Sequence, residues 1–145
     1  MKTCARQASA RWMGTRQRGK GAINTPSAAL KMTLHAADSD AKGGGTNPAE
    51  LIAAAIAGSF SVTLADELGQ AGYKPREIDT MATVTLEHLA NGWTLTQMLL
   101  SVTAIVPRAA ECDFVDAALR AKANCPISRA LNANTLMTAK LTRNE

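Results

Sequence analysis

A chain of 145 residues has the length of one ordinary domain. Its hydrophobic share is 46%, but 28 of these residues are Ala and only five residues are aromatic. Because each Ala side chain buries little apolar surface, a monomer of this composition would have low stability. We therefore expect a second copy of the chain to add buried area. No uninterrupted apolar run approaches the roughly 18 residues of a membrane span. The charged share of 19% is too ordinary for a disordered chain.

Charge is distributed unevenly along the chain. Residues 1–37 carry seven basic side chains and no acid, whereas the remainder has a net charge of −3. A basic segment of this kind is typical of a nucleic-acid surface, a transit peptide or a solvated hairpin face. Because aromatic side chains are scarce and no nucleic-acid motif occurs, we expect the solvated face and no nucleic-acid partner.

The three cysteines, Cys4, Cys112 and Cys125, form no CxxC pair. An odd number without that spacing argues against a disulfide framework and against a zinc site. Since only His35 and His88 could serve as imidazole ligands, we expect no metal, no cofactor and a reducing, cytoplasmic location.

The predicted elements place antiparallel sheet apart from helices, which is an α+β architecture. Apolar and polar residues alternate on both sides of Asn91-Gly92, the favoured two-residue turn of a β-hairpin. No repeat or linker is visible, so residues 1–145 are predicted to form a single domain. Its elements in chain order are an N-terminal β-hairpin (3–36, with strands 3–12, 19–25 and 29–36), a central helix (48–70), a long hairpin (78–106), helices (111–131) and a last strand (133–142).

The central helix has a well-marked start. Thr46 or Asn47 can cap it, and Pro48 suits the first helical position. Glu50 lies in the first turn, where the helix dipole favours an acid.

The two halves of this helix differ in polarity. Residues 51–58 are apolar on all sides, so we expect them to be buried all round. The second half is amphipathic, and we expect Asp66 and Glu67 on its solvent-facing side.

Short motifs stand at characteristic spacings through the chain. They are Trp12-Met13-Gly14, Arg18-Gly19-Lys20-Gly21, Gly45-Thr46-Asn47-Pro48, Glu50-Leu51-Ile52-Ala53-Ala54-Ala55, Phe60-Ser61, Leu68-Gly69-Gln70-Ala71-Gly72, Ile78-Asp79-Thr80 and Ala121-Lys122-Ala123-Asn124-Cys125-Pro126-Ile127-Ser128. Each motif is weak alone, but their order and spacing resemble the family of the osmotically inducible protein OsmC and the organic hydroperoxide resistance protein Ohr. The resemblance covers about residues 8 to 142 and is closest to the OsmC branch.

This resemblance implies an OsmC-like fold, with antiparallel sheets around a buried central helix in an intertwined homodimer. It also implies a thiol-dependent peroxidase that reduces organic hydroperoxides with two cysteines and no metal. The first cysteine, in the central helix, attacks the peroxide, and the second, at the start of a later helix, closes a disulfide with it. An arginine and a glutamate hold the attacking thiolate, and dithiols such as lipoylated proteins are the usual reductants of the Ohr branch.

Of the two cysteine positions that the resemblance implies, this sequence has a cysteine at one and a serine at the other. Cys125 matches the second cysteine, and Asn124-Cys125-Pro126 independently places its sulfur at a helix N-terminus, where a thiol pKa is lowered. Ser59 stands where the attacking cysteine is expected. Because serine cannot be oxidised to a sulfenic acid, we expect the ordinary two-cysteine cycle to be absent.

Two supporting positions also depart from the family pattern. The glutamate falls on Ala49, with Glu50 as the neighbouring substitute. The loop arginine of the OsmC branch falls on Ser39, and Arg18 or Arg16 of the first hairpin would replace it, as in the other branch. Because these differences accompany the missing cysteine, they favour natural divergence over a laboratory Cys→Ser change.

The role of Ser59 itself has a simple structural interpretation. Its hydroxyl is expected to bond a carbonyl one turn earlier in the helix. A hydrolytic role would need His35 or His88 as base, with Asp38 or Glu87 as partner, and the GxSxG elbow is missing.

Two other functions stay open at this point. One is a non-catalytic homodimer that binds an apolar small molecule or an organic hydroperoxide in an interface pocket. The other is a one-cysteine redox protein that uses Cys125 with a dithiol reductant. A membrane partner is not expected in either case.

Overall fold

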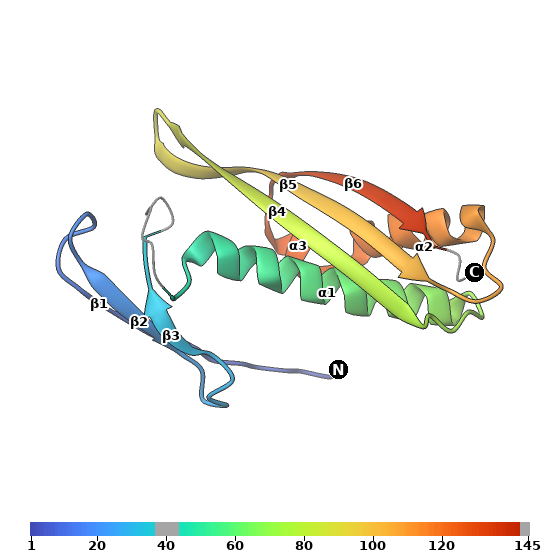
Figure 1. Cartoon of the computed structure of the whole chain (residues 1–145), viewed down its shortest axis with the longest axis horizontal. Coiled ribbons are helices and arrows are strands. Elements are labelled where there is room, and N and C mark those ends of the chain that lie inside the picture. Colours follow the sequence, from blue (N-terminus) through green and yellow to red (C-terminus); the bar gives the residue numbers. More distant parts are fainter. Residues whose placement is uncertain (37–43, 143–145) are drawn as a thin grey trace. The chain divides into compact units, whose positions relative to one another are not determined.

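The computed structural model describes residues 1–36 and 44–142. Two compact units make up the chain, residues 1–51 and residues 52–145 (Figure 1). Within the described residues, the elements are β1 (Ser9–Met13), β2 (Lys20–Asn24), β3 (Lys31–Leu34), α1 (Pro48–Gln70), β4 (Glu77–Leu89), β5 (Gly92–Ile105), α2 (Glu111–Asn124), α3 (Pro126–Ala130) and β6 (Asn134–Leu141).

The first unit holds an antiparallel sheet with the strand order β1-β2-β3. Trp12 pairs with Gly21 across β1 and β2. A Cβ at Gly21 would lie 2.8 Å from the indole of Trp12, so glycine is required for this close approach. The first strand begins at Ser9 rather than at residue 3, because β2 ends at Asn24, the partner of Ser9, and offers no further ladder.

The second unit holds a sheet with the order β4-β5-β6. The hairpin of β4 and β5 turns at Ala90 and Asn91, one residue earlier than expected, because Leu89 pairs with Gly92. Gly92 begins β5 with φ +109, a conformation that favours glycine. The expectation of purely antiparallel sheets was wrong here, since β6 runs parallel to β5. Parallel neighbours need a crossover connection, and α2 and α3 supply it.

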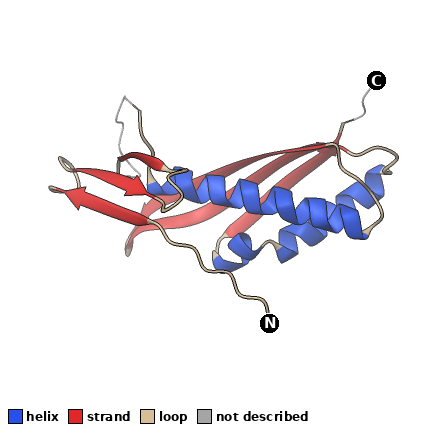
Figure 2. Ribbon diagram, turned by 90° about the horizontal axis from the view of Figure 1, so that it is seen from below, coloured by secondary structure: helices blue, strands red, loops and turns tan. Residues whose placement is uncertain are grey.

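All three helices cover one face of this second sheet (Figures 1 and 2). Side chains from α1, from α2 and from the covered face of β5 form the apolar core between them. The small side chains of α2 let its backbone approach closely, while two phenylalanines fill the remaining volume. The fully or almost fully buried members are Ile56, Phe60, Leu64, Leu68, Met98, Leu100, Val102, Ala104, Phe114, Ala117, Ala118 and Ala121.

Helix α1 differs from its prediction in two respects. Residues Ala54, Ala55 and Gly58 are exposed in the single chain, so its first half is not buried on every side. By length and composition α1 is also long and apolar enough to cross a membrane. The helix has no uninterrupted apolar run of that length, because Ser and Thr interrupt the run without making the helix polar. Core helices pass the same test, and one stripe of α1 packs into the core here.

Candidate functional site

Ser59 and Cys125 meet in the second unit. Ser59 lies midway along α1, and Cys125 lies between α2 and α3. The Cys125 thiol donates a hydrogen bond to Ser59 Oγ, with 3.3 Å between sulfur and oxygen. Cys125 is completely buried and Ser59 is half-buried. The structure thus brings together two positions that are 66 residues apart in the sequence.

Backbone hydrogen bonds fix the place of Cys125. Its N–H donates to the carbonyl of Ala121 at 2.8 Å, which closes the last turn of α2. Its carbonyl accepts from the N–H of Arg129 at 3.0 Å, which opens α3. Pro126 occupies the first position of α3, where its missing N–H costs nothing. The sulfur therefore stands at a rigid joint between two helices.

The surroundings of Cys125 favour the thiolate. Burial by itself raises the pKa of the Cys125 thiol. Hydrogen bonds from the hydroxyls of Ser128 and Ser59 act in the opposite direction, as do the backbone N–H groups of Ser128 and Ile127. The balance leaves the pKa of Cys125 below its ordinary value of 9.0. The Ser128 hydroxyl is buried but forms no hydrogen bond of normal geometry within the described residues, so the contact with Ser59 is the side-chain bond that the geometry supports directly.

The hydroxyl of Ser59 does not bond the helix backbone, contrary to expectation. That pattern occurs two residues later, where Ser61 Oγ donates to the carbonyl of Ala57 at 2.8 Å. Thr63 Oγ1 likewise donates to the carbonyl of Ser59 at 2.8 Å. The Ser59 hydroxyl instead pairs with Cys125, because the end of α2 places the sulfur within its reach.

Glu67 was predicted on the solvent side of α1, but it is only 8% exposed. Its Oε1 accepts from Asn124 Nδ2 and its Oε2 accepts from Arg120 Nε, both at 2.9 Å. These bonds, that of Asn124 first and that of Arg120 second, hold the pKa of Glu67 below its ordinary value. Helical periodicity could not find this contact, because both partners of Glu67 lie on another helix, more than 50 residues later in the chain.

The other predicted site residues belong to the first unit. Glu50 Oε1 accepts from Thr46 Oγ1 at 3.0 Å. The Glu50 N–H donates to Asn47 Oδ1 at 2.9 Å, so Asn47 caps the helix. Arg18 is exposed, and its N–H donates to Thr15 Oγ1 at 3.2 Å. The predicted counterpart of the loop arginine, at position 39, lies outside the described residues.

An apolar-lined pocket lies in the first unit. Arg16 lines it, whereas Arg18 does not. His35 contributes an imidazole whose Nε2 lies 3.3 Å from the carbonyl of Gly44. Indole, aliphatic and cationic groups thus share one concave surface, which suits an apolar molecule with a polar end. The lining residues are Trp12, Gly14, Arg16, Leu34, His35, Ala36 and Pro48.

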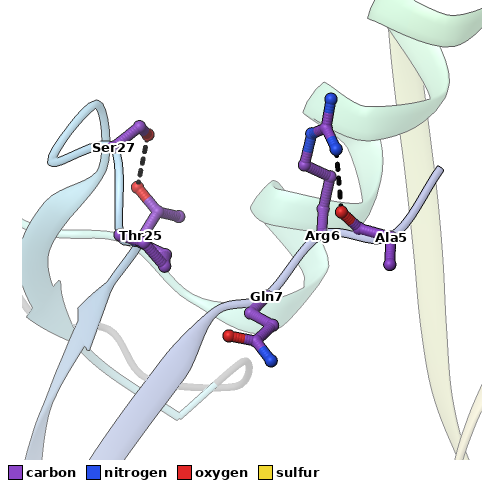
Figure 3. A pocket seen from close by; sticks show the side chains of 6 residues that line it. Ala5, Arg6, Gln7, Thr25 and Ser27 are labelled. Carbon is purple, nitrogen blue, oxygen red and sulfur yellow. Dashed lines mark hydrogen bonds between the residues drawn. The ribbon is translucent and has the colours of Figure 1, made fainter.

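A second pocket of the first unit lies between the N-terminal segment and the β2–β3 turn (Figure 3). The guanidinium of Arg6 donates to the carbonyl of Ala5 at 2.8 Å, and the hydroxyls of Thr25 and Ser27 pair at 3.2 Å. Its lining includes neither a thiol nor an acid, so we assign no chemistry to it.

The remaining candidates for catalysis form no hydrogen bond with Ser59 within the described residues. Cys4 and Cys112 are exposed free thiols. His88 packs edge-on against Trp93 at the end of the long hairpin, with 5.2 Å between ring centroids. His35 lies in the first unit, and its proposed acidic partner at position 38 lies outside the described residues. Within residues 1–36 and 44–142, no three His, Cys, Asp or Glu side chains gather as metal ligands.

Comparisons with known proteins agree with this fold. The family described as OsmC-like protein matches residues 39–140. A peroxiredoxin OsmC from Escherichia coli (strain K12) is 36% identical over 140 residues, which is 96% of this chain and 98% of that protein. The organic hydroperoxide resistance protein OhrB of Bacillus subtilis has a TM-score of 0.68 at 19% identity, over 94% of this chain and 98% of its own. An organic hydroperoxide resistance protein OsmC from Legionella pneumophila has a TM-score of 0.70 at 20% identity, over 97% of this chain and 99% of its own.

Proposed function

The chain belongs to the OsmC-like family, and we propose that it reduces organic hydroperoxides through Cys125 alone, without an intramolecular disulfide. The observation that carries this proposal is the 3.3 Å contact between Cys125 Sγ and Ser59 Oγ. The Ser59 hydroxyl lies beside Cys125 at the position where the family resemblance predicts the attacking cysteine. Because a serine hydroxyl cannot form a disulfide, the ordinary two-cysteine cycle lacks its attacking cysteine at position 59.

The proposed reaction uses one protein thiol and an external dithiol. The Cys125 thiolate attacks one peroxide oxygen, the O–O bond breaks, and the alkoxide leaves as the alcohol after taking a proton from water. Cys125 is then a sulfenic acid. One thiol of the dithiol attacks its sulfur and releases water, which gives a mixed disulfide. The second thiol of the same reductant displaces Cys125 as the free thiol and leaves the reductant as its disulfide.

Two hydroxyls support this role of Cys125. A thiolate is the nucleophile in peroxide reduction, so groups that donate hydrogen bonds to it raise its population at neutral pH. Ser59 and Ser128 both lower the pKa of Cys125 in this way. Because Cys125 is fully buried, the peroxide reaches the sulfur only when neighbouring side chains move, so we expect slow turnover.

Peroxide consumption tests the proposal. The full chain, a Cys125→Ser variant and a Cys112→Ser control are incubated with cumene hydroperoxide and a dithiol, and the remaining peroxide is measured. We expect turnover above buffer for the full chain and the Cys112→Ser control, and none for Cys125→Ser. An unchanged rate in Cys125→Ser would contradict the assignment.

A binding function is the second candidate, and the pocket beside Trp12 and Arg16 favours it. Its apolar lining with two cationic or titratable groups suits an apolar small molecule. If binding is the function, an apolar molecule co-purifies with the chain and peroxide turnover stays at the level of buffer.

We also propose that the chain works as a homodimer in the reducing cytoplasm, where its three free thiols would persist. Ala54, Gly58 and Val62 are spaced four residues apart and share one exposed face of α1, and Val62 is 72% exposed. Small residues on such a face let a second helix approach closely. Sedimentation tests this assembly, since a mass of 15.2 kDa at micromolar concentration would be that of a single chain.

A further inference from the structure

We infer that Glu67 is a positioning residue for the sulfur of Cys125, acting through Asn124 and Arg120. This inference rests on the proposed role of Cys125 as the reactive thiol. Glu67 does not contact Cys125 in any described hydrogen bond. Glu67 instead binds Arg120 and Asn124, two side chains of the helix that leads to Cys125, and Asn124 is the last residue of that helix.

The geometry joins α1 to the last turn of α2 at a single carboxylate. Arg120 and Asn124 are four residues apart, so they lie on the same face of α2. Each donates to a different oxygen of Glu67 at 2.9 Å. Both carboxylate oxygens of Glu67 therefore accept a hydrogen bond from α2. These two bonds fix the C-terminal end of α2 against α1 at the position of Glu67.

The position of Cys125 follows from that anchoring. Asn124 is the last residue of α2 and is joined directly to Cys125, whose N–H closes the final turn on Ala121. Helix ends fray where their polar groups lose partners. If the last turn of α2 loosens, the sulfur moves away from Ser59 Oγ and from the N–H groups of α3. The contact at Glu67 therefore holds in place the donors that favour the Cys125 thiolate.

The charge of Glu67 and its anchoring of α2 have opposite expected effects on the thiolate population of Cys125, so an experiment can distinguish them. A carboxylate near a thiolate disfavours it by repulsion, so loss of the Glu67 charge alone would increase the thiolate population. Loss of the anchor separates Cys125 from its hydrogen-bond donors, so the thiolate population would fall. The sign of the change distinguishes the two effects.

The experiment titrates Cys125 in the full chain with Cys4→Ser and Cys112→Ser, so that it is the sole thiol. Thiolate is followed by its ultraviolet absorbance as pH rises, and circular dichroism verifies the helix content. The variants are Glu67→Ala, the isosteric Glu67→Gln and the control Asp66→Asn. Asp66 is the exposed neighbour that accepts from Gln70 at 2.8 Å, so its variant removes a charge without touching α2.

We expect Glu67→Ala to lower the thiolate fraction at neutral pH by about three- to tenfold, which corresponds to a rise of up to about one pKa unit. Glu67→Gln keeps an acceptor for Asn124 and should show a smaller fall, and Asp66→Asn should show none. An unchanged or increased thiolate fraction in both Glu67 variants would overturn the inference. A parent thiol with an ordinary pKa would overturn the proposed function instead, which keeps the two failures distinct.

Discussion

The sulfur of Cys125 lies 3.3 Å from the hydroxyl oxygen of Ser59, across the contact between α1 and the joint of α2 and α3. The fold therefore brings these two side chains together at this point. One of them can be oxidised and the other cannot. The contact is therefore a hydrogen bond and not a disulfide.

A Ser59→Cys variant should form a disulfide with Cys125. The two side-chain termini already touch, so a disulfide with Cys125 needs only a small rotation of each side chain. Closing a loop between positions 66 residues apart stabilises the native state by about 4 kcal/mol in the chain-entropy description. We expect two thiols fewer by titration after peroxide treatment, and a melting temperature that falls when a reductant is added.

Ser61→Cys is the matched control for that experiment. Ser61 lies on the same helix, but its hydroxyl bonds Thr80 and the carbonyl of Ala57, each at 2.8 Å, and not Cys125. It should lose no thiol to an internal disulfide. Equal thiol loss in both variants would mean that proximity to Cys125 does not decide the reaction.

Acid should weaken the fold partly through Glu67. Its pKa is lowered in the folded chain, so its contribution is fully present above the ordinary value of 4.5 and is lost as pH falls through the folded-state pKa. The difference in unfolding free energy between the natural chain and Glu67→Gln should therefore be largest near neutral pH and shrink in acid. Urea unfolding at several pH values measures it, and a difference that grows in acid would contradict this sign.

The core beneath the site should be sensitive to truncation. Phe60 directly follows Ser59 and is completely buried in the core cluster. Phe60→Ala should lower the free energy of unfolding by about 3–5 kcal/mol, because it removes buried apolar surface and leaves a cavity. Leu119→Ala is the control, since Leu119 is 53% exposed and its truncation should cost far less. Equal losses in chemical denaturation would contradict the core assignment.

The proposed dimer should depend on the exposed face of α1. Val62→Asp places a charge at a side chain that is 72% exposed in the single chain, so folding should be little affected. Burying an unpaired charge between two copies is costly, so the variant should sediment as a monomer while the natural chain does not. A dimer of unchanged affinity in Val62→Asp would exclude this face as the interface.

Local signals in the sequence predicted much of the fold. The helix cap at Asn47 and the proline after Cys125 each act over a few residues, and each has its expected geometry. The Asn91-Gly92 signal located the long hairpin but placed its turn one residue too late. The family resemblance supplied the overall fold, which the comparisons confirm.

Long-range partners were not predictable in the same way. The burial of Glu67 depends on Arg120, 53 residues later, and helical periodicity holds no information about that contact. The parallel pairing of β6 likewise depends on where α2 and α3 return the chain. The extra residue in β5 opposite Thr85 and Leu86 interrupts an alternation that looks regular in the sequence.

The most direct test of the central claim is the intact mass of the natural chain after brief treatment with an organic hydroperoxide and dimedone, a reagent that traps sulfenic acids. Peptide mapping then locates the product. We predict one dimedone adduct on Cys125 and no internal disulfide. A loss of two hydrogens that maps to a disulfide between Cys125 and another cysteine of the same chain, with no adduct, would contradict the account.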